Sequence, residues 1–141
     1  MAKKNFIDDI SVNTIVGPGA LITGNVAVSG FLRIDGDIDG NVQTQGRVII
    51  GEEARIRGNI RAASVSVGGI VQGDIIAPDY VILLSSGIVF GSILTKKLRG
   101  DDDVILHGFC SATGDQNDFD EAEKKYYNQQ ALHSSNFSYS Q

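Results

Sequence analysis

The chain has 141 residues, a formal net charge of −5, 17 glycines, one cysteine and no tryptophan. This length favours a single domain, and an acidic chain without a stripe of lysine and arginine is not expected to bind nucleic acid. No apolar run approaches the roughly 18 residues of a membrane-spanning helix, and no secretory signal peptide is recognisable, so we expect a cytoplasmic protein.

The first 13 residues lack any periodic pattern. They combine two lysines with a few isolated apolar side chains and two aspartates, and their charges cancel. We therefore predict a flexible N-terminal tail over residues 1–13.

A repeat begins at residue 14 and continues to residue 112. It is marked by six glycines at intervals of 16, 18, 15, 18 and 17 residues, namely Gly24, Gly40, Gly58, Gly73, Gly91 and Gly108. Aliphatic residues stand two positions before each glycine, and small or aliphatic residues stand two and four positions after it. Alternation with a period of two predicts β-strands, and recurrence of the whole unit predicts a solenoid. The fold class is therefore all-β, a single-domain parallel β-helix of about six coils.

Aligned residues of successive coils are expected to stack in columns that form a common core. The two predicted core columns contain Ile22, Ile38, Ile56, Val71 and Val89 before the glycines, and Val26, Val42, Ile60, Ile75 and Ile93 after them. The longer coils differ from the shorter ones by polar or small insertions at residues 51–54 and 84–87, which are typical of turns. Insertions at such corners leave the columns in register. Scattered glycine and abundant β-branched residues disfavour a helical protein.

From residue 113 the chain loses its β-branched residues and becomes rich in Gln, Asn, Ser and acidic residues. This composition predicts a disordered acidic and polar C-terminal tail over residues 113–141, within which residues 118–133 could form a transient helix. Its aromatic residues are candidate contacts with a partner, and a purely solubilising tail is the alternative.

Candidate catalytic and metal-binding residues are few. His107 stands alone on the last coil, whereas a metal site would need two or three ligands in register. Asp35, Asp37 and Asp39 begin like a calcium loop, but Gly46 occupies the position where that loop needs a glutamate. Cys110 belongs to an inward column, which indicates a core residue in a reducing compartment. We therefore predict no enzyme activity, no cofactor and no metal site.

The two ends of the predicted coil stack are more informative. A terminal coil has unpaired backbone groups and an open slice of core, and solenoids that stay monomeric cover both with a cap. No convincing cap is present here, so stacking of identical rods would produce a filament. The expected contact residues are Ile15 and Val16 at the first end, and Phe109 with Leu106 beneath it at the last. The alternative for Phe109 is that it packs beneath the tail as a cap.

Four motifs of the repeat, in this order, resemble the bactofilin family. They are TIVGPG at residues 14–19, GFLRIDG at residues 30–36, GRVIIG at residues 46–51 and ARIRGNI at residues 54–60, and the resemblance covers about residues 14–112. It implies a right-handed β-helix that polymerises without nucleotide or metal into non-polar filaments, through alternating like-to-like end contacts. It also implies a bacterial cytoskeletal role, often beneath the inner membrane, in cell shape or in localising cell-wall enzymes, which the C-terminal tail could bind.

Two features depart from this family. Members often carry a phenylalanine just before the last glycine, where this chain has Leu106, so the resemblance alone does not identify the aromatic residue of the end contact. Several members attach to membrane through a short N-terminal tail. The residues that could act in this way here are Lys3, Lys4, Phe6 and Ile7, although two aspartates follow at once.

Two other classes of protein share part of the pattern. Residues 15–26 also resemble the hexapeptide repeats of left-handed β-helix acyltransferases, but those enzymes need an unbroken six-residue period and a positioned histidine. A monomeric adaptor rod that displays its faces to partners is the third possibility, and the assembly state distinguishes it from a polymer.

Overall fold

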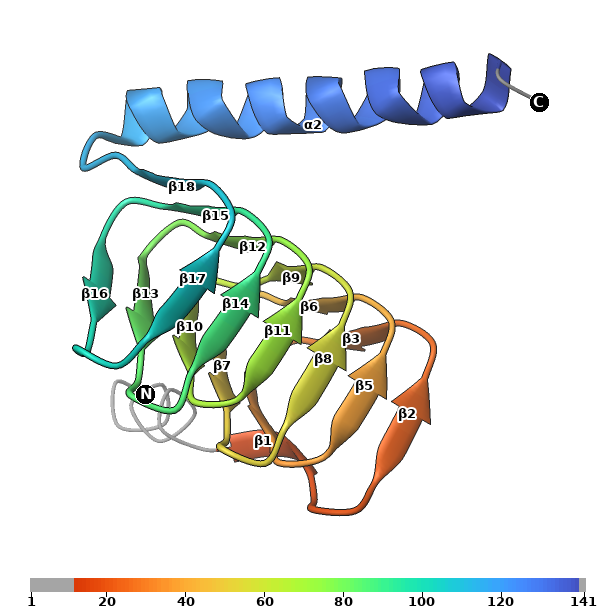
Figure 1. Cartoon of the computed structure of the whole chain (residues 1–141), viewed down its shortest axis with the longest axis vertical. Coiled ribbons are helices and arrows are strands. Elements are labelled where there is room, and N and C mark those ends of the chain that lie inside the picture. Colours follow the sequence, from red (N-terminus) through yellow and green to blue (C-terminus); the bar gives the residue numbers. More distant parts are fainter. Residues whose placement is uncertain (1–11, 140–141) are drawn as a thin grey trace, which may run out of the picture.

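The computed structural model describes residues 12–139. Eighteen short strands form six coils, each with three strands, and the coils stack into a rod (Figure 1). All strand pairs between neighbouring coils are parallel, so each side of the rod is a six-stranded parallel sheet. This confirms the predicted parallel β-helix of six coils.

The three sheets take their strands in order along the rod. Sheet A contains β1 (Val12–Val16), β4 (Phe31–Ile34), β7 (Arg47–Ile50), β10 (Ser64–Val67), β13 (Tyr80–Leu83) and β16 (Leu98–Gly100). Sheet B contains β2 (Leu21–Thr23), β5 (Asp37–Asp39), β8 (Arg55–Arg57), β11 (Ile70–Gln72), β14 (Ile88–Phe90) and β17 (Ile105–His107). Sheet C contains β3 (Val26–Val28), β6 (Val42–Thr44), β9 (Ile60–Arg61), β12 (Ile75–Ala77), β15 (Ile93–Thr95) and β18 (Cys110–Ala112).

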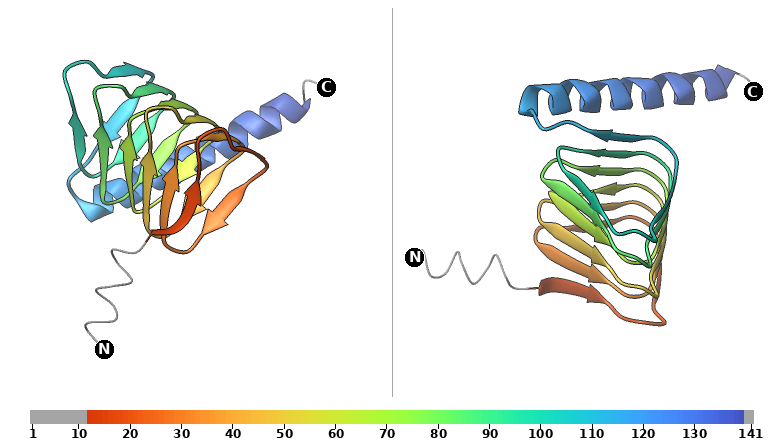
Figure 2. Two further views of the ribbon diagram at one scale, coloured as in Figure 1. Left: turned by 90° about the horizontal axis from the view of Figure 1, so that it is seen from below. Right: turned by 60° about the vertical axis from the view of Figure 1, so that its left-hand side comes forward.

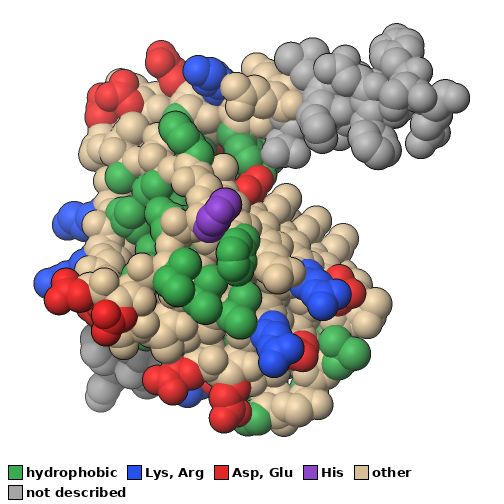
Figure 3. All heavy atoms as spheres, in the orientation of Figure 1, with side chains coloured by type: hydrophobic (Ala, Val, Ile, Leu, Met, Phe, Trp, Pro, Cys, Tyr) green, Lys and Arg blue, Asp and Glu red, His purple; other side chains and the backbone are tan. Residues whose placement is uncertain are grey.

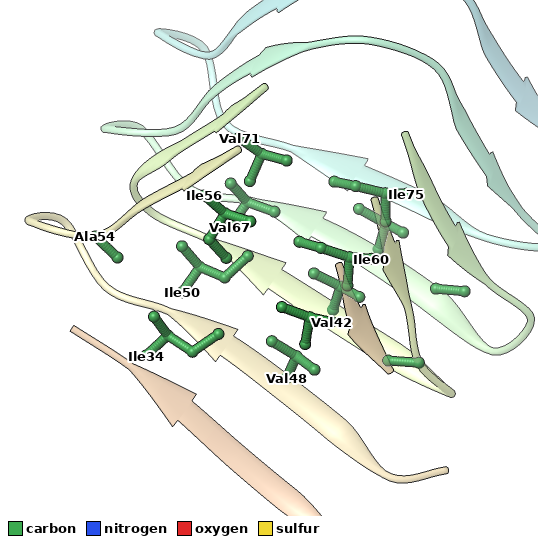
Figure 4. Close-up of a cluster of buried hydrophobic side chains, with 14 of the residues drawn as sticks. Ile34, Val42, Val48, Ile50, Ala54, Ile56, Ile60, Val67, Val71 and Ile75 are labelled. Atoms are coloured by element: carbon green, nitrogen blue, oxygen red, sulfur yellow. The ribbon is translucent and has the colours of Figure 1, made fainter. Parts of the chain in front are cut away.

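The core is a set of stacked aliphatic columns. In sheet B, Ile38 pairs in register with Ile56 and Ile56 with Val71, and each of these side chains is at most 1% exposed. Figure 4 shows such side chains converging from the surrounding strands. Of the ten predicted column residues, eight are buried, and Ile22 and Val26 in the first coil pack partly buried against them.

Glycine is required at the corner between sheets B and C because successive coils touch there through their backbones. A Cβ atom on Gly73 would lie 2.0 Å from the carbonyl oxygen of Gly58, and one on Gly58 would lie 2.1 Å from that of Gly40. No side chain fits at these distances. The 15- to 18-residue spacing of the glycines thus follows from the contact between coils.

A ladder of side chains stabilises the position after each of these glycines. The Oδ1 atom of Asn25 accepts the backbone N–H of Asn41 at 3.0 Å, and Asn41 accepts that of Asn59 at 2.8 Å. Asn59 accepts the N–H of Asp74 at 2.9 Å, and Asp74 accepts that of Ser92 at 2.8 Å. Each polar side chain therefore satisfies a backbone group of the next coil.

The C-terminal segment was expected to be a polar tail that could form a helix over residues 118–133, and the structure has a helix in this region. Helix α2 (Gln116–Tyr139) follows the last coil and lies outside the coil stack (Figures 1 and 2). Phe119 is 1% exposed and forms a small cluster with Ile76 and Leu94, on the outer face of sheet C. Composition indicated only a transient helix here because the apolar contacts of α2 are few and come from another part of the chain.

Two polar contacts fasten α2 to the same flank. The Tyr126 hydroxyl donates a hydrogen bond to Oδ2 of Asp74 at 2.6 Å, and Arg61 forms an ion pair with Glu123 at 2.6 Å. Burial, followed by the hydrogen bond to Asp74, raises the pKa of Tyr126, so the phenol stays protonated and remains a donor. Helix α2 thus covers the side of the rod.

Candidate functional site

The two ends of the rod are its most distinctive surfaces. Among the described residues, 12–139, strands β1, β2 and β3 at the first end each pair with one neighbour, as do β16, β17 and β18 at the last end. Each end therefore has three strand edges whose outward N–H and C=O groups lie outside the ladders between coils. Such edges can pair with another chain.

The core is open at both ends. Aliphatic core residues in the middle coils are almost fully buried, but their counterparts in the terminal coils are only partly buried. These are Ile22, Val26 and Val28 in the first coil, and Leu98, Val104, Leu106 and Cys110 around the last. A cross-section of apolar core thus meets solvent at each end, and burial of this surface would stabilise contact with a partner.

At the first end, the expected contact residues lie side by side on β1. Ile15 is 64% exposed and faces outward, whereas Val16 is 5% exposed and belongs to the core cluster. Leu21, which the sequence analysis did not single out, is 68% exposed on the neighbouring terminal strand β2. The sequence did contain a signal for Leu21. It is an aliphatic residue at an outward strand position, where the next two coils have the charged residues Asp37 and Arg55.

At the last end, Phe109 is 71% exposed at the corner between β17 and β18. It occupies the column of the polar ladder, which stops at Ser92 one coil earlier. Leu106 lies partly buried on β17 among the inward residues. The structure therefore places an apolar inward residue and an outward aromatic residue together at this end.

Helix α2 leaves Phe109 uncovered. Phe109 and Leu94 line one side of a groove of about 460 Å³, and Ala122 and Tyr126 of α2 line the other. The described part of the tail therefore lies beside Phe109 and does not bury it, unlike the alternative in which the tail caps this residue. The sequence analysis also did not single out Ile76 and Leu94, the residues of sheet C that contact α2. They could have been recognised from the doublets Ile75-Ile76 and Ile93-Leu94, because the other coils have a small or polar residue at the second position.

The remaining candidate groups show no catalytic arrangement in the described part of the chain. Cys110 is partly buried, and burial raises the pKa of its thiol, which disfavours a reactive thiolate. The ring of His107 lies 5.9 Å from that of Phe90. Over residues 12–139, His, Cys, Asp and Glu side chains form no group of three or more that could hold a metal ion. Asp37 and Asp39 lie on β5 opposite Arg55 and Arg57 of β8.

Two expectations concern membrane contact. Lys3, Lys4, Phe6 and Ile7 lie outside the described residues. Within the described part, α2 is far too polar to cross a bilayer, and no other helix there is a candidate.

Comparison with known proteins gave consistent matches. Residues 14–111 match the family model Bactofilin, whose description is polymer-forming cytoskeletal. Bactofilin BacP of Myxococcus xanthus (strain DK1622) is 30% identical over 96 residues, a match that covers 68% of this chain and 40% of BacP. The chain thus spans less than half the length of that relative. Bactofilin BacO of the same organism is 25% identical over 99 residues, which cover 70% of this chain and 79% of BacO.

A solved structure also matches the rod. It is a cryo-EM reconstruction of Thermus thermophilus bactofilin double helical filaments, with a TM-score of 0.68 and 27% sequence identity. The match covers 70% of this chain and 98% of that one.

Proposed function

Because the chain belongs to the bactofilin family of polymer-forming cytoskeletal proteins, we propose that its rods join end to end into non-polar filaments without nucleotide or metal. The observation that carries this proposal is that no described residue, from 12 to 139, caps either end of the rod. Each end combines three open strand edges with an exposed slice of apolar core, and helix α2 lies on the flank between them.

The folded rod already contains what such assembly needs. Both end surfaces are built from strands held in place by the coil beneath, so little conformational entropy is lost when two ends meet. Burial of the open core and pairing of the strand edges supply the favourable free energy. Neither term depends on a bound nucleotide or its hydrolysis.

Like-to-like contacts fit the ends better than head-to-tail contacts. Head-to-tail stacking would continue the coil and place Phe109 in the column directly before Asn25 of the next copy. Phe109 would then stand where the ladder needs an acceptor, and its aromatic side chain cannot accept a hydrogen bond from the backbone N–H of Asn25. Contact between two identical ends, related by a two-fold axis, sets Phe109 against Phe109 and leaves both ladders intact.

We extend the proposal to a site at the cytoplasmic face of the inner membrane, where filaments would support cell shape or localise cell-wall machinery. Lys3 and Lys4 would attract an anionic surface by about 1 kcal/mol each. One copy would therefore bind weakly, but many tails along a filament would bind together firmly. Phe6 and Ile7 would add apolar contact.

Electron microscopy of the purified protein tests the assembly proposal. We expect long thin filaments in buffer that contains EDTA and no nucleotide, with no change when nucleotide and magnesium are added. Uniform small particles under both conditions would contradict the proposal and favour an adaptor rod. Filaments that need magnesium or nucleotide would contradict only the claim of spontaneous assembly.

Deletion of residues 2–10 tests the membrane proposal. We expect the deletion variant to polymerise normally but to lose co-sedimentation with vesicles that contain anionic phospholipid. The matched control replaces Lys3 and Lys4 with glutamine and should lose most, but not all, of the binding. Undiminished sedimentation of the deletion variant with vesicles would show that the anchor lies elsewhere.

A further inference from the structure

A groove at the corner between sheets A and B has no part in the end contacts. It has a volume of about 540 Å³, and its lining comes from successive coils, from Pro18 in the first to Leu84 in the fifth. Ile49 forms part of its wall, and Leu84 is 41% exposed. Gly68 also lines the groove, and a Cβ atom there would lie 3.5 Å from Cδ1 of Leu84. The absence of this atom helps to keep the groove open. We call Ile49 and Leu84 its apolar wall.

The charges around the groove are only partly compensated. Asp35 forms a salt bridge with Arg33, with 3.0 Å between Oδ2 and Nε. Glu52 and Glu53 also line the groove, are exposed and form no salt bridge within residues 12–139. We call these two residues the acidic rim. Figure 3 shows acidic side chains, in red, along the lower left edge of the molecule, where corners between sheets A and B lie. The groove therefore fits a segment that has both apolar and basic residues.

We propose that this groove binds the chain's own N-terminal segment, residues 1–11, and thereby competes with the membrane for the same side chains. This segment precedes the described residues, and its sequence has the matching residue types. Phe6 and Ile7 suit the apolar wall, and Lys3 and Lys4, further from the rod along the chain, suit the acidic rim. The inference rests on the proposed membrane contact of these four residues.

The segment is long enough to reach the groove. It joins β1 at Val12, and β1 leads at its other end into the corner that contains Pro18. From Val12 across sheet A to the corner of the third coil is about 20 Å, at about 3.3 Å per residue along a strand and about 4.8 Å per coil. Six extended residues span about the same distance. Phe6 therefore reaches the groove, and the lysines before it extend along the rim.

The covalent link favours this segment over any other occupant of the same chemistry. A short tethered segment acts at an effective concentration in the millimolar range, about a thousandfold above that of a partner or a second copy at micromolar concentration. A contact of only millimolar affinity is therefore about half occupied within one chain but stays empty between separate chains. Anionic lipid does not fit the groove, because the acidic rim repels its head groups.

Docking of the segment makes membrane attachment conditional. Phe6, Ile7 and the two lysines cannot contact the groove and a bilayer at the same time. The apparent affinity for a membrane therefore falls with the fraction of segments that are docked. A rod away from the membrane keeps its apolar anchor residues covered, and an anionic surface has to displace them.

Zero-length cross-linking of the full-length protein tests the docking. A carbodiimide joins an amine to a carboxylate in direct contact, and mass spectrometry identifies the linked peptides. We expect links from Lys3 or Lys4 to the acidic rim in wild type without vesicles, and a yield about threefold lower in Leu84→Gln, which removes part of the apolar wall. Phe90→Gln is the matched control, because Phe90 is 45% exposed on sheet B and lies outside the groove lining. Its yield should equal that of wild type.

Two results would overturn the docking. One is the absence of these links in wild type. The other is links between chains when isotope-labelled and unlabelled proteins are mixed, because these would assign the groove to the segment of another copy. Neither result affects the proposed membrane contact, which the deletion of residues 2–10 tests separately.

Vesicle binding tests the competition. On vesicles with equal amounts of phosphatidylglycerol and phosphatidylcholine, Leu84→Gln should bind about threefold more tightly than wild type, because more of its segments are free. Simple loss of an exposed apolar side chain would weaken binding, so the two explanations differ in sign. Phe90→Gln should bind like wild type. Equal or weaker binding by Leu84→Gln would overturn the competition. If wild type does not bind vesicles at all, the membrane proposal fails, and the competition fails with it.

Discussion

Replacement of Phe109 by arginine is expected to abolish filaments and leave soluble, folded particles. Phe109 is 71% exposed at the open end of the last coil, so an arginine there leaves the core undisturbed. In a like-to-like contact the substitution brings two cations into the same interface. Loss of an aromatic residue on which an interface depends costs about 2 kcal/mol or more, so the critical concentration for assembly should rise at least about thirtyfold.

The size of the remaining particle reports the polarity of the filament. If identical ends meet, Phe109→Arg blocks one kind of contact and leaves the other, so analytical ultracentrifugation should detect dimers joined at their first ends. If rods joined head to tail, the same variant would be a monomer. Gln43→Arg is the matched control, because it adds the same charge at an exposed position of sheet C and should polymerise like wild type. Normal filaments from Phe109→Arg would exclude this residue from the contact.

Replacement of Ile60 by aspartate is expected to unfold the rod. Ile60 is 1% exposed in the middle of the core, with Val42 on one side and Ile75 on the other in the same column. A carboxylate there has no partner, and its burial costs on the order of 5 kcal/mol or more. This loss is comparable with the whole stability of a typical domain.

Circular dichroism provides the measurement. Ile60→Asp should lack the cooperative thermal transition of a folded β-protein, while Ile60→Val should lose only about 1 kcal/mol and melt slightly earlier. Gln43→Asp, one coil away but exposed, should melt like wild type because its carboxylate stays in water. A melt of Ile60→Asp that matched wild type would mean that residue 60 does not face the core.

The fold could be predicted from the sequence because every coil of a solenoid must meet the same physical requirements. Each coil must place glycine where backbones touch, as at Gly58 and Gly73, and an aliphatic residue two positions to either side. Six recurrences make this pattern much clearer than any single strand would be. The same periodicity identified the first and last coils, and hence the ends with Ile15 and Phe109.

The contacts on the sides of the rod could not be predicted in the same way. Helix α2 is held on the rod because Phe119 packs against Ile76 and Leu94, residues about 25 to 43 positions earlier in the chain. These two residues lie on a flank that only the coiled fold creates. Its composition resembles that of a disordered segment, and local propensity contains no information about this partner surface.

Local periodicity was therefore sufficient for the coil architecture, the core columns and the location of the open ends, because these depend on spacing along the chain. Tertiary structure alone decided that α2 lies on sheet C and leaves Phe109 exposed. It also aligned Ile70, Ile88 and Ile105, from three separate coils, on the outer face of sheet B. The physical reason is that both surfaces arise between coils, where residues 17 or 18 positions apart become neighbours only after the rod has formed.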